Sequence, residues 1–286
     1  MTVRIEKATK TGFCFGVSRA IARLEKVAQE RGGIETLGAV VHNEQVVKRL
    51  EKIGVRVAAS LDDVKGRVVA TSTHGIGPQL EQAILARDTG IISTTCPFVR
   101  RAQMAARRLS EAGFFVVVYG SADHPEVRGI LGWAKAGGLA TLDAASLESL
   151  PARRRLGILA QTTQVPDSFI AFAGKVLASA YGKDSEIRVL DTICHDIRER
   201  QAAALELAGR VDIMLVVGGR SSANTHRLVE LCSSITEARL VQTAGEIEPE
   251  WVRGKTSVGV TAGASTAEDT VDEVVARLRE ITGAGG

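Results

Sequence analysis

The chain contains few of the residues that mark several common protein classes. It has 286 residues, of which four are cysteines and 4% are aromatic, and its formal net charge is +3. Four cysteines without a C-x-x-C pair argue against a disulfide scaffold and against a local zinc knuckle. The small net charge gives no indication of a nucleic-acid surface. The chain is therefore expected to be globular, and any site built from several of its thiols must use cysteines that lie far apart in the sequence.

Long apolar segments are also missing. The apolar runs at 114–119 and 213–217 are far shorter than the ~20 residues that a membrane helix needs. The first ten residues, MTVRIEKATK, lack the apolar core of a signal peptide. We therefore expect a cytoplasmic protein that contacts neither membrane nor nucleic acid. A hydrophobic content of 45% still supports well-filled cores.

One spacing recurs three times along the chain. Cys14, Cys96 and Cys194 each lie 28 residues before a second polar residue, and each of those residues follows a glycine by four positions. The three polar residues are His42, His124 and Ser222. The repeated interval predicts three copies of one α/β unit, which we place at residues 1–95, 96–190 and 191–286. Each copy contributes one thiol to a shared site.

The pattern inside each copy predicts the fold class. Each of the three cysteines follows a β-rich stretch (VRIEKA, IISTT or IRVLDT) and precedes an amphipathic helical pattern. Strands that alternate with helices predict an α/β fold with parallel sheets, and ligands of such sheets collect at the carboxyl ends of the strands. We expect three related units around a pseudo-threefold axis, with a central cavity for the thiols. His74, Thr162 and Ser265 are predicted to occupy equivalent strand ends.

Three thiols at helix N-termini suit a soft metal centre, because the helix dipole favours the thiolate. An iron–sulfur cube normally takes four cysteines, so with three ligands one iron keeps an open position and can act as a Lewis acid. The alternative for any cysteine is a small buried hydrophobic residue. We assign that role to Cys232, whose neighbours Leu228, Leu231 and Ile235 have the spacing of a helix core face.

Nine motifs carry a resemblance to a known family. In order they are GFCFGVSRAI around Cys14, VVHN, THG, TTCPFV around Cys96, DHPEV, QTT, DTIC at Cys194, SSANTHRL and VTAGAS. Over about residues 5–280 the chain resembles the 4-hydroxy-3-methylbut-2-enyl diphosphate reductase family. The resemblance implies reductive dehydroxylation of that allylic diphosphate to isopentenyl diphosphate and dimethylallyl diphosphate. This is the last step of non-mevalonate isoprenoid biosynthesis.

The same resemblance implies a cofactor, an electron donor and residue roles. It implies a [4Fe–4S] cluster held by Cys14, Cys96 and Cys194, or its [3Fe–4S] form after oxidation, reduced by a ferredoxin or flavodoxin. Glu126 is implied as the proton donor and Thr162 as a hydroxyl that helps to relay the proton. The residues implied for substrate and diphosphate binding are His42, His74, His124, Thr162, Ser222, Asn224 and Ser265.

Two of these residues also fit purely structural roles. Asp123-x-x-Glu126 with Pro125 is a helix start signature, and Ser265 with Glu268 fits a capping box. The chain also departs from the family pattern, because Ser221 stands where asparagine is frequent. Ala223 offers no hydroxyl to a phosphate.

Two other functions stay open at this point. One is a different three-cysteine [4Fe–4S] enzyme, such as a dehydratase or a quinolinate-synthase-like enzyme, whose carboxylate substrate would favour arginine or lysine at the polar turns. The other is a binding module with a purely structural metal, which would be a colourless zinc protein with four filled ligand positions.

Overall fold

The computed structural model describes residues 3–147, 154–180 and 185–283. The chain forms two compact units, each of which is described here by itself. The terminal unit contains Met1–Ser18, Val41–Lys52 and His195–Gly286, and the central unit contains Arg19–Val40 and Ile53–Cys194. Within the described ranges, none of the helices combines the length and the apolar character that crossing a bilayer requires.

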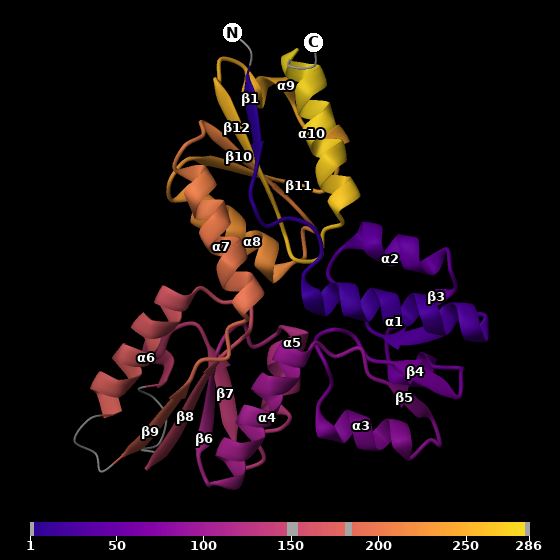
Figure 1. Cartoon of the computed structure of the whole chain (residues 1–286). Helices are drawn as coiled ribbons and strands as arrows, with labels where there is room; N and C mark the ends of the chain where they lie inside the picture. The colour runs from indigo at the N-terminus through magenta and orange to yellow at the C-terminus, as the bar shows by residue number, and fades with distance from the viewer. Residues whose placement is uncertain (1–2, 148–153, 181–184, 284–286) are drawn as a thin grey trace. The chain divides into compact units, whose positions relative to one another are not determined.

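The terminal unit is built on one parallel sheet with the strand order β1-β12-β10-β11. Its strands are β1 (Arg4–Lys7), β12 (Ser257–Ala262), β10 (Ile213–Val217) and β11 (Glu237–Val241). Helices α7 (His195–Ala208) and α8 (Ala223–Ser233) pack on one face, and α10 (Glu268–Thr282) packs on the other (Figure 1). The unit also holds α2 (Glu44–Glu51), the short helix η3 (Ala244–Glu246) and α9 (Pro249–Val252).

Strand β10 shows why this sheet needs helices on both faces. Its residues alternate between the two faces, as expected for a period of two. Ile213, Leu215 and Val217 join the core formed with α10, whereas Met214 and Val216 join the core formed with α7 and α8. All five are fully buried. A strand that is apolar on both faces is typical of a parallel sheet covered by helices.

The central unit contains two further parallel sheets. The first has the order β3-β2-β4-β5, and the second has the order β7-β6-β8-β9. The first comprises β2 (Ile34–Leu37), β3 (Val55–Ala58), β4 (Val68–Ala70) and β5 (Gly90–Ile92), with η1 (Leu61–Asp63) and α3 (Pro78–Leu85). The second comprises β6 (Phe115–Tyr119), β7 (Gly138–Thr141), β8 (Arg155–Ala160) and β9 (Glu186–Leu190). Its helices are α4 (Pro97–Glu111), α5 (Pro125–Leu131), η2 (Ala144–Leu147) and α6 (Pro166–Ala180). Helix α1 (Phe15–Arg31) contains the boundary between the two units.

The three sheets are copies of one topology, which confirms the predicted α/β class with three related parallel sheets. In each sheet the strand that precedes the next cysteine forms the edge: β5 pairs with β4, β9 with β8, and β1 with β12. Strand β1, expected to open the first copy, therefore belongs to the third sheet. The physical reason is that β12 is buried along its whole length and needs a hydrogen-bonding partner on both sides. As folding units, the ranges 1–95, 96–190 and 191–286 stay a prediction.

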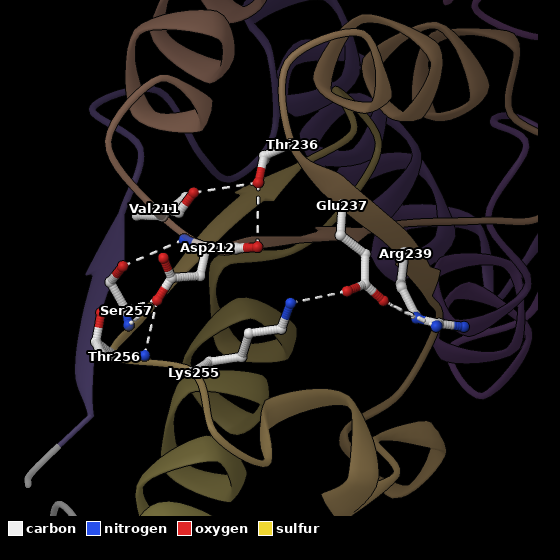
Figure 2. A network of polar contacts seen from close by, with 8 residues as sticks. All are labelled: Val211, Asp212, Thr236, Glu237, Arg239, Lys255, Thr256 and Ser257. Atoms are coloured by element: carbon white, nitrogen blue, oxygen red, sulfur yellow. Dashed lines mark hydrogen bonds and ion pairs between the residues drawn. The ribbon is translucent and has the colours of Figure 1, made fainter.

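A polar network fixes the amino ends of strands in the terminal unit (Figure 2). The Asp212 carboxylate accepts hydrogen bonds from the Thr256 N–H (2.7 Å), the Thr256 hydroxyl (2.8 Å) and the Ser257 N–H (2.9 Å). These bonds lower the pKa of Asp212 to about 2. Thr236 donates to the Asp212 carbonyl oxygen at 3.1 Å. The network ties together the chain segments at the amino ends of β10, β11 and β12.

Candidate active site

Each of the three repeated cysteines directly precedes a helix: Cys14 precedes α1, Cys96 precedes α4 and Cys194 precedes α7. Each also makes the same backbone bond to the loop after a strand. The N–H groups of Cys14, Cys96 and Cys194 donate to the carbonyl oxygens of Ala264 (2.9 Å), Thr73 (3.0 Å) and Thr162 (3.0 Å), respectively. All four cysteines of the chain lie in the described ranges, and none is in a disulfide. The predicted place of these thiols at strand-to-helix junctions is confirmed.

This recurring bond corrects one predicted equivalence. The accepting residues Thr73, Thr162 and Ala264 are equivalent, so the residue after each of them is equivalent too: His74, Thr163 and Ser265. Thr162 was expected in the place of Thr163, which is wrong by one position. The Thr163 hydroxyl oxygen is buried and meets no hydrogen-bond partner among the described residues. Thr163 could not be told from Thr162 in the sequence, because the QTT motif offers two adjacent hydroxyls that only the backbone bond to Cys194 distinguishes.

Glu126 and Thr162 form a buried pair within the central unit. Glu126 lies on α5 and is 2% exposed. One carboxylate oxygen accepts the Thr162 N–H at 2.7 Å, and the other accepts the Thr162 hydroxyl at 2.9 Å. Burial raises the pKa of Glu126 to about 7, although both bonds from Thr162 act in the opposite direction. A carboxyl group with this pKa carries a proton in a large fraction of molecules near neutral pH, as a general acid requires.

The structural alternative for Glu126 is only partly correct. Helix α5 does begin at Pro125, as the pattern predicts, but its N-cap is His124. Asp123 instead forms an ion pair with Arg128 at 3.0 Å. Because the Glu126 carboxylate binds Thr162, no capping box forms between Asp123 and Glu126. The carboxylate of Glu126 is therefore not used to cap its own helix.

Two histidines lie near this pair in the central unit. The His124 Nδ1 atom accepts the Glu126 backbone N–H at 3.2 Å, so the neutral ring of His124 carries its hydrogen on Nε2. The rings of His74 and His124 meet edge to face, with their centroids 5.3 Å apart. Gly129 on α5 lies beside the His74 loop: a Cβ atom there would be in ordinary contact with the His74 carbonyl oxygen, at 3.5 Å.

The terminal unit contributes a second set of polar groups. Ser222 caps α8 and accepts the Thr225 N–H at 3.3 Å. Asn224 is 4% exposed, and within the described part of the chain neither its amide nitrogen nor its amide oxygen has a hydrogen-bond partner. A buried amide costs free energy when it makes no hydrogen bond, so these two atoms are candidate contacts for a polar ligand.

Ser265 does not have the structural role that its sequence allowed. Helix α10 begins at Glu268 with Ala267 as its N-cap, so the capping box expected between Ser265 and Glu268 is absent. Instead, the Ser265 carbonyl oxygen accepts a hydrogen bond from the Asn43 amide nitrogen at 3.0 Å. This bond holds the residue after His42 against the loop that follows β12.

The interval of 28 residues also needs a correction in the first copy. Asn43 caps α2, as His124 caps α5 and Ser222 caps α8, so Asn43 is their equivalent at the helix start. His42 stands one residue earlier because the loop in this copy is one residue longer. Burial lowers the pKa of His42, which favours the neutral form of its ring. Its carbonyl oxygen lies against Gly219, where a Cβ atom would come within 2.2 Å of it.

Comparisons with known proteins place these motifs in a family. A family model described as LytB protein matches residues 5–279. The chain belongs to the LytB family. This result confirms the family resemblance predicted from the nine motifs.

Relatives of known name cover nearly the whole chain. The 4-hydroxy-3-methylbut-2-enyl diphosphate reductase of Dehalococcoides mccartyi is 53% identical over 98% of this chain and 99% of its own length. The protein of the same name from Geobacter metallireducens is 42% identical over 97% of each chain. A solved structure of the E-1-hydroxy-2-methyl-but-2-enyl-4-diphosphate reductase from Plasmodium falciparum is similar, with a TM-score of 0.91 and 26% identity. The match covers 98% of this LytB chain and 89% of that one.

Proposed function

We propose that the chain reduces 4-hydroxy-3-methylbut-2-enyl diphosphate to isopentenyl diphosphate and dimethylallyl diphosphate, the last step of non-mevalonate isoprenoid biosynthesis. Membership of the LytB family and the names of its full-length relatives support this function. The observation that carries the proposal is the buried Glu126 carboxyl, which has a pKa near neutral pH and binds Thr162. The reaction needs such an acid because hydroxide is a poor leaving group.

The thiols of Cys14, Cys96 and Cys194 are the proposed ligands of a [4Fe–4S] cluster. All three precede helices, where the dipole favours a thiolate. Burial raises the pKa of the Cys96 thiol, while the backbone amides of Phe98 and Val99 lower it, so metal binding must displace the thiol proton. The donor set fits a cube with three protein ligands. When bound, the cluster would pass on two electrons, one at a time, from the external donor and would supply one Lewis-acidic iron.

Cys232 is not a candidate for a fourth ligand. It is fully buried in the apolar core formed by α7, α8 and β10. Burial raises the pKa of its thiol to about 11, which disfavours the thiolate that iron binds. The prediction that Cys232 is a core residue is confirmed.

Glu126 and Thr162 supply the proton that the leaving oxygen needs. The overall change consumes two electrons and two protons: the C–O bond breaks, the oxygen leaves as water, and the allylic carbon skeleton gains one hydrogen. The Glu126 carboxyl gives the first of these protons, and the Thr162 hydroxyl can pass it on because it donates and accepts at once. General acid assistance of this kind is worth about 10²–10⁴-fold in rate.

The diphosphate is bound by polar side chains that carry no fixed charge, and two of them stand at helix starts. The proposed donors to the diphosphate are the side chains of His42, His74, His124, Ser222, Asn224 and Ser265, whereas the Thr162 hydroxyl contacts the substrate beside Glu126. His124 and Ser222 cap α5 and α8, where backbone N–H groups and the helix dipole favour an anion. The Asn224 amide, which is buried without a partner in the described chain, gains hydrogen bonds when the diphosphate binds.

One anaerobic assay tests this proposal. Purified protein receives the allylic diphosphate and a reduced viologen, with reduced ferredoxin or flavodoxin as the expected natural donors. Two oxidised viologen molecules should appear for each isopentenyl or dimethylallyl diphosphate formed. A dehydratase would release water without oxidising the dye, and a binding protein with structural zinc would be colourless and inactive. Either result would overturn the proposal.

A further inference from the structure

Arg200 is the largest of the fully buried side chains in the described residues, with an exposure of 1%. It lies on α7 within the terminal unit. One guanidinium nitrogen donates to the carbonyl oxygens of Lys10 (3.3 Å) and Ala262 (3.0 Å). The other donates to the carbonyl oxygen of Gly12 at 3.0 Å. One side chain thus joins the end of β12 to the loop that leads to Cys14.

The other two copies make this connection with a threonine. Thr94 lies two residues before Cys96, and its hydroxyl donates to the carbonyl oxygen of Thr71 at the end of β4. In the same way, Thr192 lies two residues before Cys194, and its hydroxyl donates to the carbonyl oxygen of Ala160 at the end of β8. Both threonines are buried. Each hydroxyl holds the loop before its cysteine against the neighbouring strand.

The first cysteine cannot use a threonine in this way. The residue two before Cys14 is Gly12, whose φ of +70° strongly favours glycine. In this copy Arg200, which lies on α7, makes the connection between loop and strand instead. At the equivalent position, six residues after the cysteine, the other two copies have the buried alanines Ala20 and Ala102.

We propose that Arg200 is a positioning residue that holds the Lys10–Cys14 loop and so fixes the place of the Cys14 thiol. The inference rests on the proposed role of Cys14 as a cluster ligand. The claim that Arg200 holds the loop does not depend on that role, because the hydrogen bonds go to backbone oxygens of the loop. Asp196, one turn earlier on α7, lies 3.6 Å from the guanidinium and balances its buried charge.

Hydrogen exchange of the full-length protein tests the structural part. The Cys14 N–H bonds to the Ala264 carbonyl oxygen, so its exchange reports whether the loop stays in place. Arg200→Met keeps most of the side-chain stem and removes the donors. We expect the Cys14 amide to exchange about tenfold faster or more, while the amides of β10 and β12 keep their protection. Arg200→Lys retains the charge but not the planar fork of donors. It should therefore keep only part of the protection that the Cys14 amide has in the wild type.

Matched variants separate positioning from general damage. Thr192→Val should accelerate exchange at Cys194 and not at Cys14, whereas Arg277→Ala, which removes a partly exposed arginine from α10, should change neither. The proposal is overturned if Arg200→Lys and Arg200→Met leave the Cys14 amide as protected as in the wild type. It is also overturned if exchange rises equally at all three cysteines.

Iron content and the cluster spectrum then test the link to function. If Arg200→Lys loosens Cys14, the anaerobically purified variant should lose iron or show a changed electron paramagnetic resonance signal of the reduced cluster. Normal iron and an unchanged signal in a loosened variant would reject the link between Arg200 and the cluster. Loss of iron in Cys14→Ser tests the ligand role separately, so failure of the proposed function and failure of this inference give different results.

Discussion

The Glu126 carboxylate binds Thr162 through both of its oxygens, one to the N–H and one to the hydroxyl. The carbonyl oxygen of the same threonine accepts the N–H of Cys194. The proposed acid, the relaying hydroxyl and one proposed cluster ligand are therefore joined in a single hydrogen-bonded chain. This connection keeps the proton source at a fixed position relative to the backbone of a ligand, which matters because misplacement of a catalytic group is costly in rate.

Glu126→Gln should lower turnover strongly and preserve binding. The amide has nearly the shape of the protonated acid but cannot give up a proton to the leaving oxygen, so kcat should fall by about 10²–10⁴-fold. Cluster absorbance and the dissociation constant of the diphosphate should stay close to those of the wild type. Single-turnover measurements under argon separate these quantities. Retained turnover in the variant would rule out Glu126 as the proton donor.

Thr162→Val should change the pH dependence in a defined direction. The hydroxyl of Thr162 lowers the pKa of Glu126, so its removal raises that pKa further. A general acid loses its proton as the pH rises, and kcat/KM falls as the pH passes the pKa of the free enzyme. The fall should therefore occur at higher pH in the variant than in the wild type. The low-pH rate should also drop, by roughly tenfold, because the relay is lost.

Thr162→Ser is the matched control for this profile. It keeps a hydroxyl beside the carboxylate, so both the position of the fall and the low-pH rate should resemble those of the wild type. If kcat/KM of Thr162→Val instead falls at lower pH than in the wild type, the Thr162 hydroxyl does not lower the pKa of the acid.

The sequence predicted the repeat, the fold class and the positions of the three cysteines because these depend on local patterns. The pairing of β1 with β12 joins residues about 250 positions apart, and no local pattern says which sheet an edge strand joins. The loop before α2 is one residue longer than its counterparts, so Asn43 and not His42 is the equivalent of His124 and Ser222. The choice between Thr162 and Thr163 depended on backbone hydrogen bonds, which the sequence does not show. Arg200 remained unnoticed because an arginine in a helix usually faces solvent.

Asn224→Ala should weaken substrate binding without lowering stability. The amide is buried and lacks partners in the described residues, so its removal breaks no hydrogen bond within the described chain. Hydrogen bonds to a charged group contribute about 1.5–3 kcal/mol, which corresponds to a roughly 10–100-fold weaker affinity for the diphosphate. Titration calorimetry and thermal unfolding measure the two effects. Ser221→Ala, at an exposed position beside the same turn, is the control and should bind normally.

Cysteine variants should divide into two groups by iron content. Cys194→Ser should lose most of the roughly four irons per chain that a [4Fe–4S] cluster supplies. Cys232→Ser should keep them, because Cys232 lies in the apolar core. It should instead lower the free energy of unfolding by about 1–3 kcal/mol, since a hydroxyl replaces a thiol in an apolar environment. Iron loss in Cys232→Ser without any unfolding would contradict its assignment to the core.

Asp212→Asn should reduce stability in a pH-dependent way. Asp212 lies at the amino end of β10, whereas the proposed site residues follow the carboxyl ends of strands. The pKa of Asp212 is lowered to about 2 by hydrogen bonds from Thr256 and Ser257 (Figure 2). A carboxyl group whose pKa is lowered in the folded protein stabilises it above the unfolded pKa of about 3.8, and this contribution disappears as the pH falls through about 2.

The melting temperature of Asp212→Asn should therefore lie below that of the wild type at pH 7, and the two values should converge as the pH falls from 4 to 2. Glu273→Gln, an exposed carboxylate on α10, serves as the control and should follow the wild type. Because Asp212 acts at the amino ends of the strands, the folded variant should retain the kcat of the wild type. A variant with normal stability but reduced kcat would instead place Asp212 in the catalytic machinery.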